Sequence, residues 1–436
     1  MGAIELAALR LGDAARATVA GQLSARSLAQ AHLARIAATE DTLRAWAHLD
    51  SERALARAER CDAVSAGRRG PLHGIGVGVK DIIATTSMPT EMGSPIYAGH
   101  HPPFDAELVA RLTSAGGYVL GKTVTTEFAH MHPGKTRNPW NQRHTPGGSS
   151  SGSAAAVAAG QVLCAIGTQT NGSVLRPAAF CGVVGFKPTK DTIPLEGVHI
   201  FSATLDQVGT FSRDVAGAAL LASALADSVG VAATAAVLVR PPRLGYLAGY
   251  PWTAIDGDAS RILDGSVARL AGQGAEIVRV DFPAGWHDAN RVHRTIMLRE
   301  GAAALGELQR RERQRMSTPL NAALDEGTAI PNADYEDAMR RRDGAIAAFA
   351  HWLSEFDALI SPPATGAAPE GLDAPGDPAC CTLWSLVGFP AISIPVGLAG
   401  NRLPVGMQIV APTGADDRLL AAAAWCEARL PFATLG

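Results

Sequence analysis

The stretch TPGGSSSGSAAAVAAG, which runs from Thr145 to Gly160, decides how the fold of this chain is interpreted. It places four serines in five positions beside a pair of glycines and then continues into alanine. A Gly/Ser linker would join two domains, but this stretch is short and is embedded between hydrophobic segments. We therefore expect its alanine-rich part to form a buried helix of small residues, and its serines to belong to a site.

Two formal motifs compete for that site. Residues 116–123, GGYVLGKT, fit a phosphate-binding loop, but such a loop follows a strand and opens a helix, whereas here a helical pattern comes first. Residues 148–152, GSSSG, fit a nucleophile elbow centred on Ser150. A helix does follow that serine, but a Pro-rich loop precedes it and no Asp-then-His order stands out downstream. Both interpretations stay open at this point, but each is weaker than the third interpretation, which follows.

A third interpretation pairs the serine run with a lysine and a second serine. Lys80 lies near the end of an apolar, β-branched segment at 74–83, where desolvation would lower its pKa and make it a candidate base. Asp81 follows it, so an ion pair at the strand end is the alternative. Ser173 follows Thr170-Asn171-Gly172, a tight turn whose backbone N–H groups could converge as an oxyanion hole.

The rest of the chain predicts an α/β fold. Helical and strand patterns alternate over 436 residues without a composition break, which favours one large domain with a mixed sheet covered by helices. Residues 4–63 are expected to be helical, and 290–316 form a long helix whose arginines indicate a solvated face. Further strands are expected at 356–364 and 389–398.

Charge and composition exclude several classes of function. The net charge of −3 offers no general attraction to nucleic acid or to an anionic membrane. No run approaches the ~18 apolar residues that a membrane span needs, and the N-terminus is a poor signal peptide. The six cysteines lack C-x-x-C spacing, so reduced thiols and a cytoplasmic location are expected. The histidines lack ligand spacing, so we expect no metal site.

Several long motifs, in order, carry a resemblance to a known family. The chain resembles the amidase-signature enzymes, which hydrolyse amides with a Ser–Ser–Lys triad, and the resemblance covers most of residues 1–436. It implies a single amidase domain, with an N-terminal helical segment at 1–63, a signature core at 64–220 and the remainder at 221–436. The matching stretches are PLHGIGVGVKD (71–81), NPWNQRHTPGGSSSGSAAAVAAG (138–160), GTQTNGSVLRPAAFCGVVGFKPT (167–189), LDQVGTFSRDV (205–215) and LVGFPAISIPVGL (386–398).

The resemblance assigns the catalytic roles. Lys80 matches the family's lysine, Ser149 the serine that follows a cis peptide bond, and Ser173 the nucleophile. Ser149 would then relay a proton from Ser173 to Lys80, and an acyl-enzyme would form on Ser173. Ser150 would support the site, while Ser151 and Ser153 would pack or cap the following helix. The oxyanion hole would use the backbone of residues 170–173, and no metal or cofactor is implied.

Departures from the family's commonest form concentrate around the nucleophile. Gln169 stands where an Asp is usual, Asn171 replaces a Gly, and Leu175 replaces an Arg, while Arg176 has appeared one residue later. This variant resembles the malonamidase and carboxybiuret-hydrolase branches, in the first of which the matching arginine holds a substrate carboxylate. An internal ion pair before Pro177 is the structural alternative for Arg176.

The predicted function is hydrolysis of a small linear amide that carries a carboxylate. The alternatives are a broad aliphatic or aryl amidase, a glutaminase-type subunit of an amidotransferase complex, and an inactive binding protein of the same fold. Further substrate contacts are expected from His130, His132 and Trp384. The expected partner is a small amide, without nucleic acid or membrane; a homodimer and a complex with a small helical accessory protein are both left open.

Overall fold

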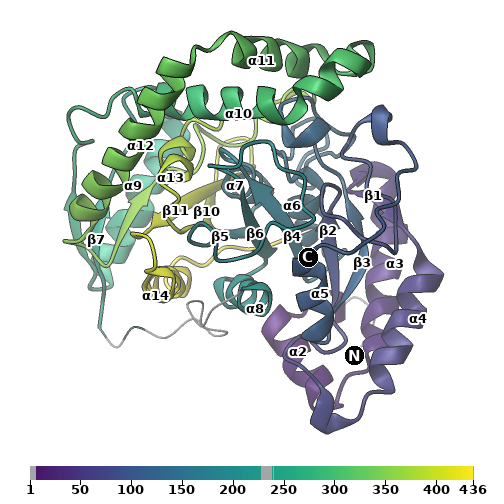
Figure 1. The fold of residues 1–436 in the computed structure, drawn as a ribbon. Helices are drawn as coiled ribbons and strands as arrows, with labels where there is room; N and C mark the ends of the chain where they lie inside the picture. The colour runs from purple at the N-terminus through teal and green to yellow at the C-terminus, as the bar shows by residue number, and fades with distance from the viewer. Residues whose placement is uncertain (1–5, 227–237, 239, 436) are drawn as a thin grey trace.

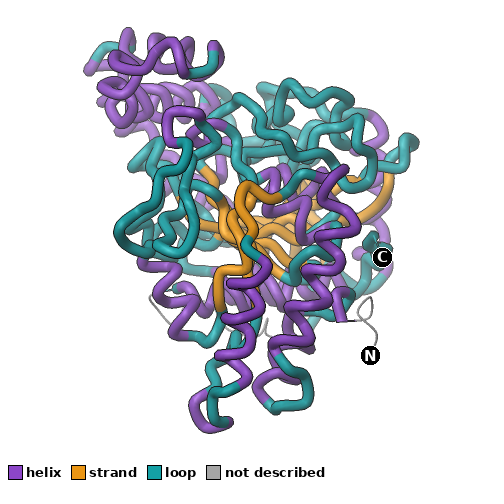
Figure 2. Tube along the Cα trace, turned by 90° about the vertical axis from the view of Figure 1, so that its right-hand side faces the viewer, coloured by secondary structure: helices purple, strands orange, loops and turns teal. Residues whose placement is uncertain are grey.

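The computed structural model describes residues 6–226, 238 and 240–435 and is built around one mixed sheet. Its strand order is β1-β3-β2-β4-β6-β5-β10-β11-β9-β7-β8. Figure 2 shows the strands in the middle of the molecule with helices on either side. The strands are β1 (Trp46–Leu49), β2 (Gly76–Lys80), β3 (Tyr118–Thr123), β4 (Cys164–Gln169), β5 (Val184–Lys187), β6 (Gln207–Ser212), β7 (Arg243–Tyr246), β8 (Glu276–Arg279), β9 (Ala358–Ser361), β10 (Ala391–Leu398) and β11 (Pro404–Val410).

Parallel and antiparallel pairs occur in the same sheet. β2 runs parallel to both β3 and β4, whereas β4 pairs antiparallel with β6 along its whole length. The predicted mixed α/β sheet is therefore confirmed. The helices of the described residues are α2 (Leu11–Val19), α3 (Ala25–Leu43), α4 (Ser51–Asp62), α5 (Glu107–Ser114), α6 (Ser151–Ala158), α7 (Leu175–Cys181), α8 (Val215–Leu225), α9 (Gly257–Gly272), α10 (Ala289–Glu312), α11 (Thr318–Ala329), α12 (Asn332–Leu353), α13 (Thr382–Leu386) and α14 (Asp416–Glu427).

The expectation of helix throughout residues 4–63 is wrong in one place. Strand β1 interrupts the helices there and pairs antiparallel with β3 at the edge of the sheet. In its short sequence, WAHL, Trp46 is buried and belongs to the same core cluster as the residues of α6. Residues 1–5 lie outside the described part of the chain.

The alanine-rich part of the opening stretch forms α6, and every residue of this helix is buried. Small side chains let it approach the neighbouring backbone closely. A Cβ atom on Gly152 would overlap the carbonyl oxygen of Ala45 and the amide nitrogen of Val124. The close approach fixes the serines at the start of α6 against the sheet.

Helices α10 and α11 run together across the top of the molecule in Figure 1. They pack against each other, and α10 also packs against α12 and α13. The predicted long helix at 290–316 is confirmed as α10, although a short 3₁₀ turn replaces its last residues. Within the described ranges, no helix combines the length and the apolar character that crossing a bilayer requires.

Candidate active site

Lys80 is the last residue of β2 and is completely buried. Its Nζ donates hydrogen bonds to Ser149 Oγ at 2.7 Å and to Thr168 Oγ1 at 2.8 Å. Burial lowers the pKa of this ammonium group to about 7, and the nearby carboxylate of Asp206 only partly opposes the effect. A substantial fraction of the amine is therefore unprotonated near neutral pH, as a general base requires.

Asp81 does not pair with Lys80, so the alternative of a strand-end ion pair between these neighbours is wrong. Its carboxylate lies 3.1 Å from Nζ of Lys122, a buried residue of β3. Lys122 also donates to Thr90 Oγ1 at 2.6 Å. Successive side chains at a strand end point to opposite sides, which separates Lys80 from the carboxylate that follows it.

The four serines of the opening stretch have different partners. Ser149 faces Lys80, whereas Ser150 Oγ accepts from the N–H of Thr168 and donates to its carbonyl, both at 3.2 Å. Ser151 donates to the carbonyl of Val124 and Ser153 to that of Ile166. The last three thus fasten the start of α6 to the sheet, and the Ser150 hydroxyl is bonded to the backbone of Thr168 and not to Lys80. The peptide bond between Gly148 and Ser149 is cis, as the resemblance implied.

The interpretation of 116–123 as a phosphate-binding loop is wrong. Its residues 118–123 form strand β3, and helix α5 precedes it. The lysine of the motif, Lys122, is completely buried and bonded to Asp81. Its ammonium group is therefore not available to a phosphate.

The turn that carries Ser173 follows β4 directly and lies against the serine run. The N–H of Ser150 donates to the Ser173 carbonyl at 3.4 Å. The N–H groups of Asn171, Gly172 and Ser173 have no hydrogen-bond acceptor among the described residues, whereas the N–H groups of the next two residues do. Free, adjacent N–H groups beside a serine hydroxyl are what an oxyanion hole requires.

Gln169 explains how the chain tolerates its departure from the family's commonest form. Its Oε1 accepts from the N–H groups of Val174 and Leu175 at 2.8 and 3.1 Å, and its Nε2 donates to Ser385 Oγ at 3.0 Å. The neutral amide of Gln169 thereby hydrogen-bonds the N–H groups at the start of α7 and the side chain of Ser385 on α13. Because Gln169 carries no charge, it needs no buried counter-ion.

A cavity of about 500 Å³ opens at this turn. One wall contains residues 170–173 and Arg176, and another is formed by the helices α10 and α11. The residues of that second wall are Asn290, His293, Arg294, Met297 and Leu298 from α10, and Pro319, Ala322, Ala323 and Glu326 from α11. No feature of the sequence predicted this wall, since the arginines of α10 indicated only a solvated face.

Arg176 borders the same cavity although it is only 2% exposed. One guanidinium nitrogen donates to the Gly148 carbonyl at 2.7 Å, while its Nε and its other terminal nitrogen have no hydrogen-bond partner among the described residues. Burial lowers its pKa to about 10, opposed by Cys381 and Asp377, so the group stays charged at neutral pH. The alternative for Arg176, an internal ion pair, is not found within the described ranges.

The other three predicted substrate contacts lie in different places. His130 does line the cavity, where its ring stacks on Phe201 with centroids 5.1 Å apart. His132 is not among the lining residues. Trp384 is completely buried, and its indole N–H donates to the Tyr250 hydroxyl at 2.7 Å. The prediction for Trp384 is corrected, because α13 turns this ring into the hydrophobic core.

One group of side chains has the composition of a metal site. Oxygen or nitrogen atoms of His48, Asp81 and Glu91 lie within 4.8 Å of one another. These atoms already have partners in the protein, since His48 Nε2 is 3.0 Å from Glu91 and Lys122 Nζ is 3.1 Å from Asp81. We assign no metal to them.

Comparison with known proteins gives one family. The family model described as Amidase matches residues 27–420. A glutamyl-tRNA(Gln) amidotransferase subunit of Acidothermus cellulolyticus is 35% identical over 98% of this chain and 94% of its own length. A solved structure described as an amidase superposes with a TM-score of 0.87 and 30% identity, over 97% of this chain and 100% of the other. The native peptide amidase of Stenotrophomonas maltophilia gives a TM-score of 0.82 and 30% identity, over 97% and 96%.

Fold, site and comparisons define an α/β enzyme that hydrolyses the C–N bond of amides. More particularly, the chain belongs to the amidase-signature family. The family that the motifs predicted is thus confirmed, and the match spans residues 27–420.

Proposed function

We propose that Ser173 attacks the carbonyl carbon of a small amide. As its oxygen forms the C–O bond, its proton passes to Ser149, whose own proton passes to neutral Lys80. The lysine then protonates the nitrogen as the C–N bond breaks, and ammonia or an amine leaves. Water hydrolyses the acyl-enzyme by the same relay in reverse order. The contact between Lys80 and Ser149 supports this path, and the free N–H groups after Thr170 support stabilisation of the oxyanion.

The substrate that we propose carries a carboxylate close to the scissile amide. The observation that carries this choice is the guanidinium of Arg176, buried at the wall of the cavity three residues beyond Ser173 with two nitrogens unbonded. An unpaired buried cation is costly, and a carboxylate would offer it paired, charge-assisted hydrogen bonds. A substrate carboxylate could approach Arg176 through the cavity that this residue lines.

The test is Arg176→Ala assayed by ammonia release from matched amides with and without a carboxylate. Removing one partner of a buried, charged contact costs about 2–5 kcal/mol. We therefore expect kcat/KM for the charged amides to fall about 30-fold or more, at ~1.4 kcal/mol per decade. Neutral amides of similar size should lose much less, and Arg176→Lys should restore little because it lacks the planar fork.

A melting curve must show that the Arg176 variant is folded, since this residue also bonds to Gly148. An equal loss for charged and neutral amides in a folded variant would make Arg176 structural. The carboxylate-bearing substrate would then be abandoned, and a broad aliphatic or aryl amidase would replace it.

A second candidate function is the glutaminase subunit of an amidotransferase complex. The relatives named as amidotransferase subunits match this chain over nearly its full length, which favours it. Ammonia release from glutamine by the chain alone, compared with release in the presence of a small helical accessory protein, tests it. A rate that depends on the second protein would favour this candidate; a cytoplasmic location and a homodimer remain predictions.

A further inference from the structure

His293 is buried on α10, far along the chain from the catalytic turn that it contacts. Its Nε2 lies 3.0 Å from the carbonyl oxygen of Thr170. A carbonyl oxygen can only accept, so Nε2 must carry the proton and donate it. Burial lowers the pKa of His293 to about 4, so the neutral form persists at ordinary pH. This imidazole therefore acts at Thr170 as a fixed donor.

Each carbonyl of the turn is held in place by one such donor. Ser385 Oγ donates to the Asn171 carbonyl at 2.5 Å, and the N–H of Arg176 donates to the Gly172 carbonyl at 3.0 Å. With His293 on Thr170, three consecutive carbonyls of the turn each accept one hydrogen bond.

Because the peptide bond is planar, these contacts of the carbonyl groups also determine the directions of the N–H groups. In a trans peptide, the carbonyl of one residue and the N–H of the next point in opposite directions within one plane. Holding the Thr170 carbonyl therefore fixes the direction of the N–H of Asn171. By the same argument, Ser385 fixes the N–H of Gly172, and the backbone of Arg176 fixes the N–H of Ser173.

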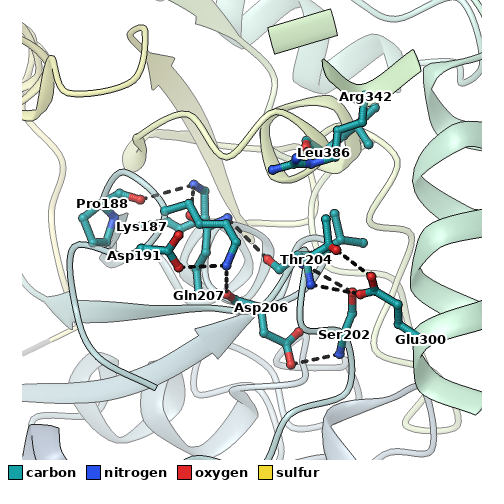
Figure 3. A network of polar contacts seen from close by, with 12 residues as sticks. Lys187, Pro188, Asp191, Ser202, Thr204, Asp206, Gln207, Glu300, Arg342 and Leu386 are labelled. Atoms are coloured by element: carbon teal, nitrogen blue, oxygen red, sulfur yellow. Dashed lines mark hydrogen bonds and ion pairs between the residues drawn. The ribbon is translucent and has the colours of Figure 1, made fainter. Parts of the chain in front are cut away.

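A second set of contacts joins α10 to the same turn through the loop at 201–206, part of which Figure 3 shows. Glu300, seven residues after His293 on α10, accepts from Ser202 Oγ at 2.5 Å and from the N–H of Thr204 at 2.9 Å. Asp206 accepts from the N–H of Ser202 at 3.1 Å and from Thr170 Oγ1 at 2.5 Å. Thr170 is thus held by its carbonyl and by its hydroxyl, and both connections lead to α10.

We propose that His293 is a positioning residue, which orients the N–H of Asn171 toward the oxyanion by holding the carbonyl of Thr170. The inference rests on the proposed acyl-enzyme mechanism. Because α10 also forms a wall of the cavity, the same helix contacts the substrate and sets the geometry of the oxyanion hole.

The test compares His293→Leu with His293→Gln. Leucine removes the donor, whereas the amide nitrogen of glutamine reaches about as far as Nε2. Loss of one direct oxyanion donor costs about 10²–10³ in kcat, so an indirect loss should be smaller. We expect kcat of His293→Leu to fall about 10- to 100-fold with KM changed less than about 3-fold. His293→Gln should recover most of that kcat, and His293→Asn, whose amide is too short, should not.

A fluorophosphonate provides a second readout, because its phosphoryl oxygen, which gains negative charge as Ser173 attacks phosphorus and fluoride leaves, would occupy the same hole. Its labelling rate should fall in parallel with kcat in His293→Leu. Two controls accompany the series: Met297→Ala, which changes the cavity wall on the same helix and should act mainly on KM, and His32→Leu, which removes a buried helical histidine of α3. The second control should leave kcat unaltered.

The outcomes separate the inference from the function on which it rests. A wild-type chain that neither hydrolyses amides nor reacts with the fluorophosphonate contradicts the proposed function. An active wild type with full kcat in a folded His293→Leu variant overturns the role of His293. So does a His293→Gln variant that recovers the melting temperature but not kcat, because that result describes a purely structural residue.

Discussion

At the scale of the residue, the burial of Lys80 destabilises the fold but makes a neutral amine available. Its amine is completely buried, and its bonding partners are two hydroxyl oxygens, of Ser149 and Thr168. Desolvation favours the neutral form of such an amine, which is the form that can accept a proton from Ser149. Burial of this lysine lowers its basicity and is thus the physical reason why a neutral amine is available near neutral pH.

Lys80→Met should therefore remove activity while making the fold more stable. We expect acylation to fall by several orders of magnitude, because both proton transfers use this amine. Wild-type activity should decline as pH falls through about 7, where Lys80 becomes protonated. Initial rates across pH 5.5–9.5 measure both effects. A wild-type-like rate in the variant with a flat pH profile would remove Lys80 from the mechanism.

The same substitution gives a stability prediction with a definite sign. The pKa of Lys80 is lowered from 10.5 to about 7 on folding, so between these values the unfolded chain binds the extra proton. Wild-type stability must then drop as pH falls through this window, by up to about 1.4 kcal/mol per pH unit. The stability gained in Lys80→Met should thus grow by about 2 kcal/mol between pH 9.5 and 7.5, measured by urea denaturation.

Lys187→Met is the matched control for both experiments. Lys187 is also completely buried with a pKa lowered to about 7. It donates to Gln207, which Figure 3 shows beside it, and to the Phe389 carbonyl. It should show the same pH-dependent stability while the midpoint of activity stays unchanged. A gain in Lys80→Met that does not vary with pH would contradict the assigned pKa.

Sequence alone predicted which motif residues the fold brings together, although their catalytic roles stay predictions. It was weaker for residues whose position depends on packing. Lys80, Ser149 and Ser173 stand in long matching segments, and the structure brings Lys80 onto Ser149 and sets the Ser173 turn beside the serine run. Trp384 was misplaced because the direction of a side chain on the five-residue helix α13 is set by the surrounding core. His293 was missed because a lone histidine on a helix carries no signal of its partner.

At the scale of the element, strand β2 ends at the lysine that we propose as the base, and the carboxylate that follows belongs to a different network. Lys80 points to Ser149, and Asp81, one residue later, points to Lys122 on β3. Burial raises the pKa of the Asp81 carboxyl, and the ammonium of Lys122 opposes that effect. The two residues share a strand end but belong to different networks.

Asp81→Asn should therefore destabilise the fold without changing the pH dependence of catalysis. Breaking one partner of a buried pair typically costs about 3–5 kcal/mol, because the other charge stays buried. Urea denaturation measures this loss, and the double variant Asp81→Asn/Lys122→Met should regain part of it. A shift in the midpoint of the pH–rate profile would contradict the separation, since it would make Asp81 the partner of Lys80.

Helix α10 shows which properties of an element can be read from its sequence. Its length and position were predicted, but its arginines indicated only a face in solvent. The pairing of α10 with α11 and the burial of His293 depend on contacts between segments far apart in the chain. Periodicity within one helix holds no information about those contacts.

At the scale of the whole molecule, one mixed sheet brings the site together. Lys80 is the last residue of β2, and β4 leads into the turn of Ser173. The serine run at the start of α6 contacts both, through Ser149 and through the N–H of Ser150. The alternation of helices and strands predicted this architecture, whereas strand order could not be predicted, since eleven strands can pair in many ways. The predicted boundaries of the segments at 1–63, 64–220 and 221–436 stay predictions.

The measurement that tests the central claim most directly is covalent labelling of the whole chain, purified without a partner, by a fluorophosphonate. Peptide mapping by mass spectrometry should find one adduct, on Ser173. The adduct should vanish in Ser173→Ala, form far more slowly in Lys80→Met, and still form on Ser173 in Ser150→Ala. An adduct on Ser150, or labelling that survives in Ser173→Ala and vanishes in Ser150→Ala, would contradict the account and restore the nucleophile elbow.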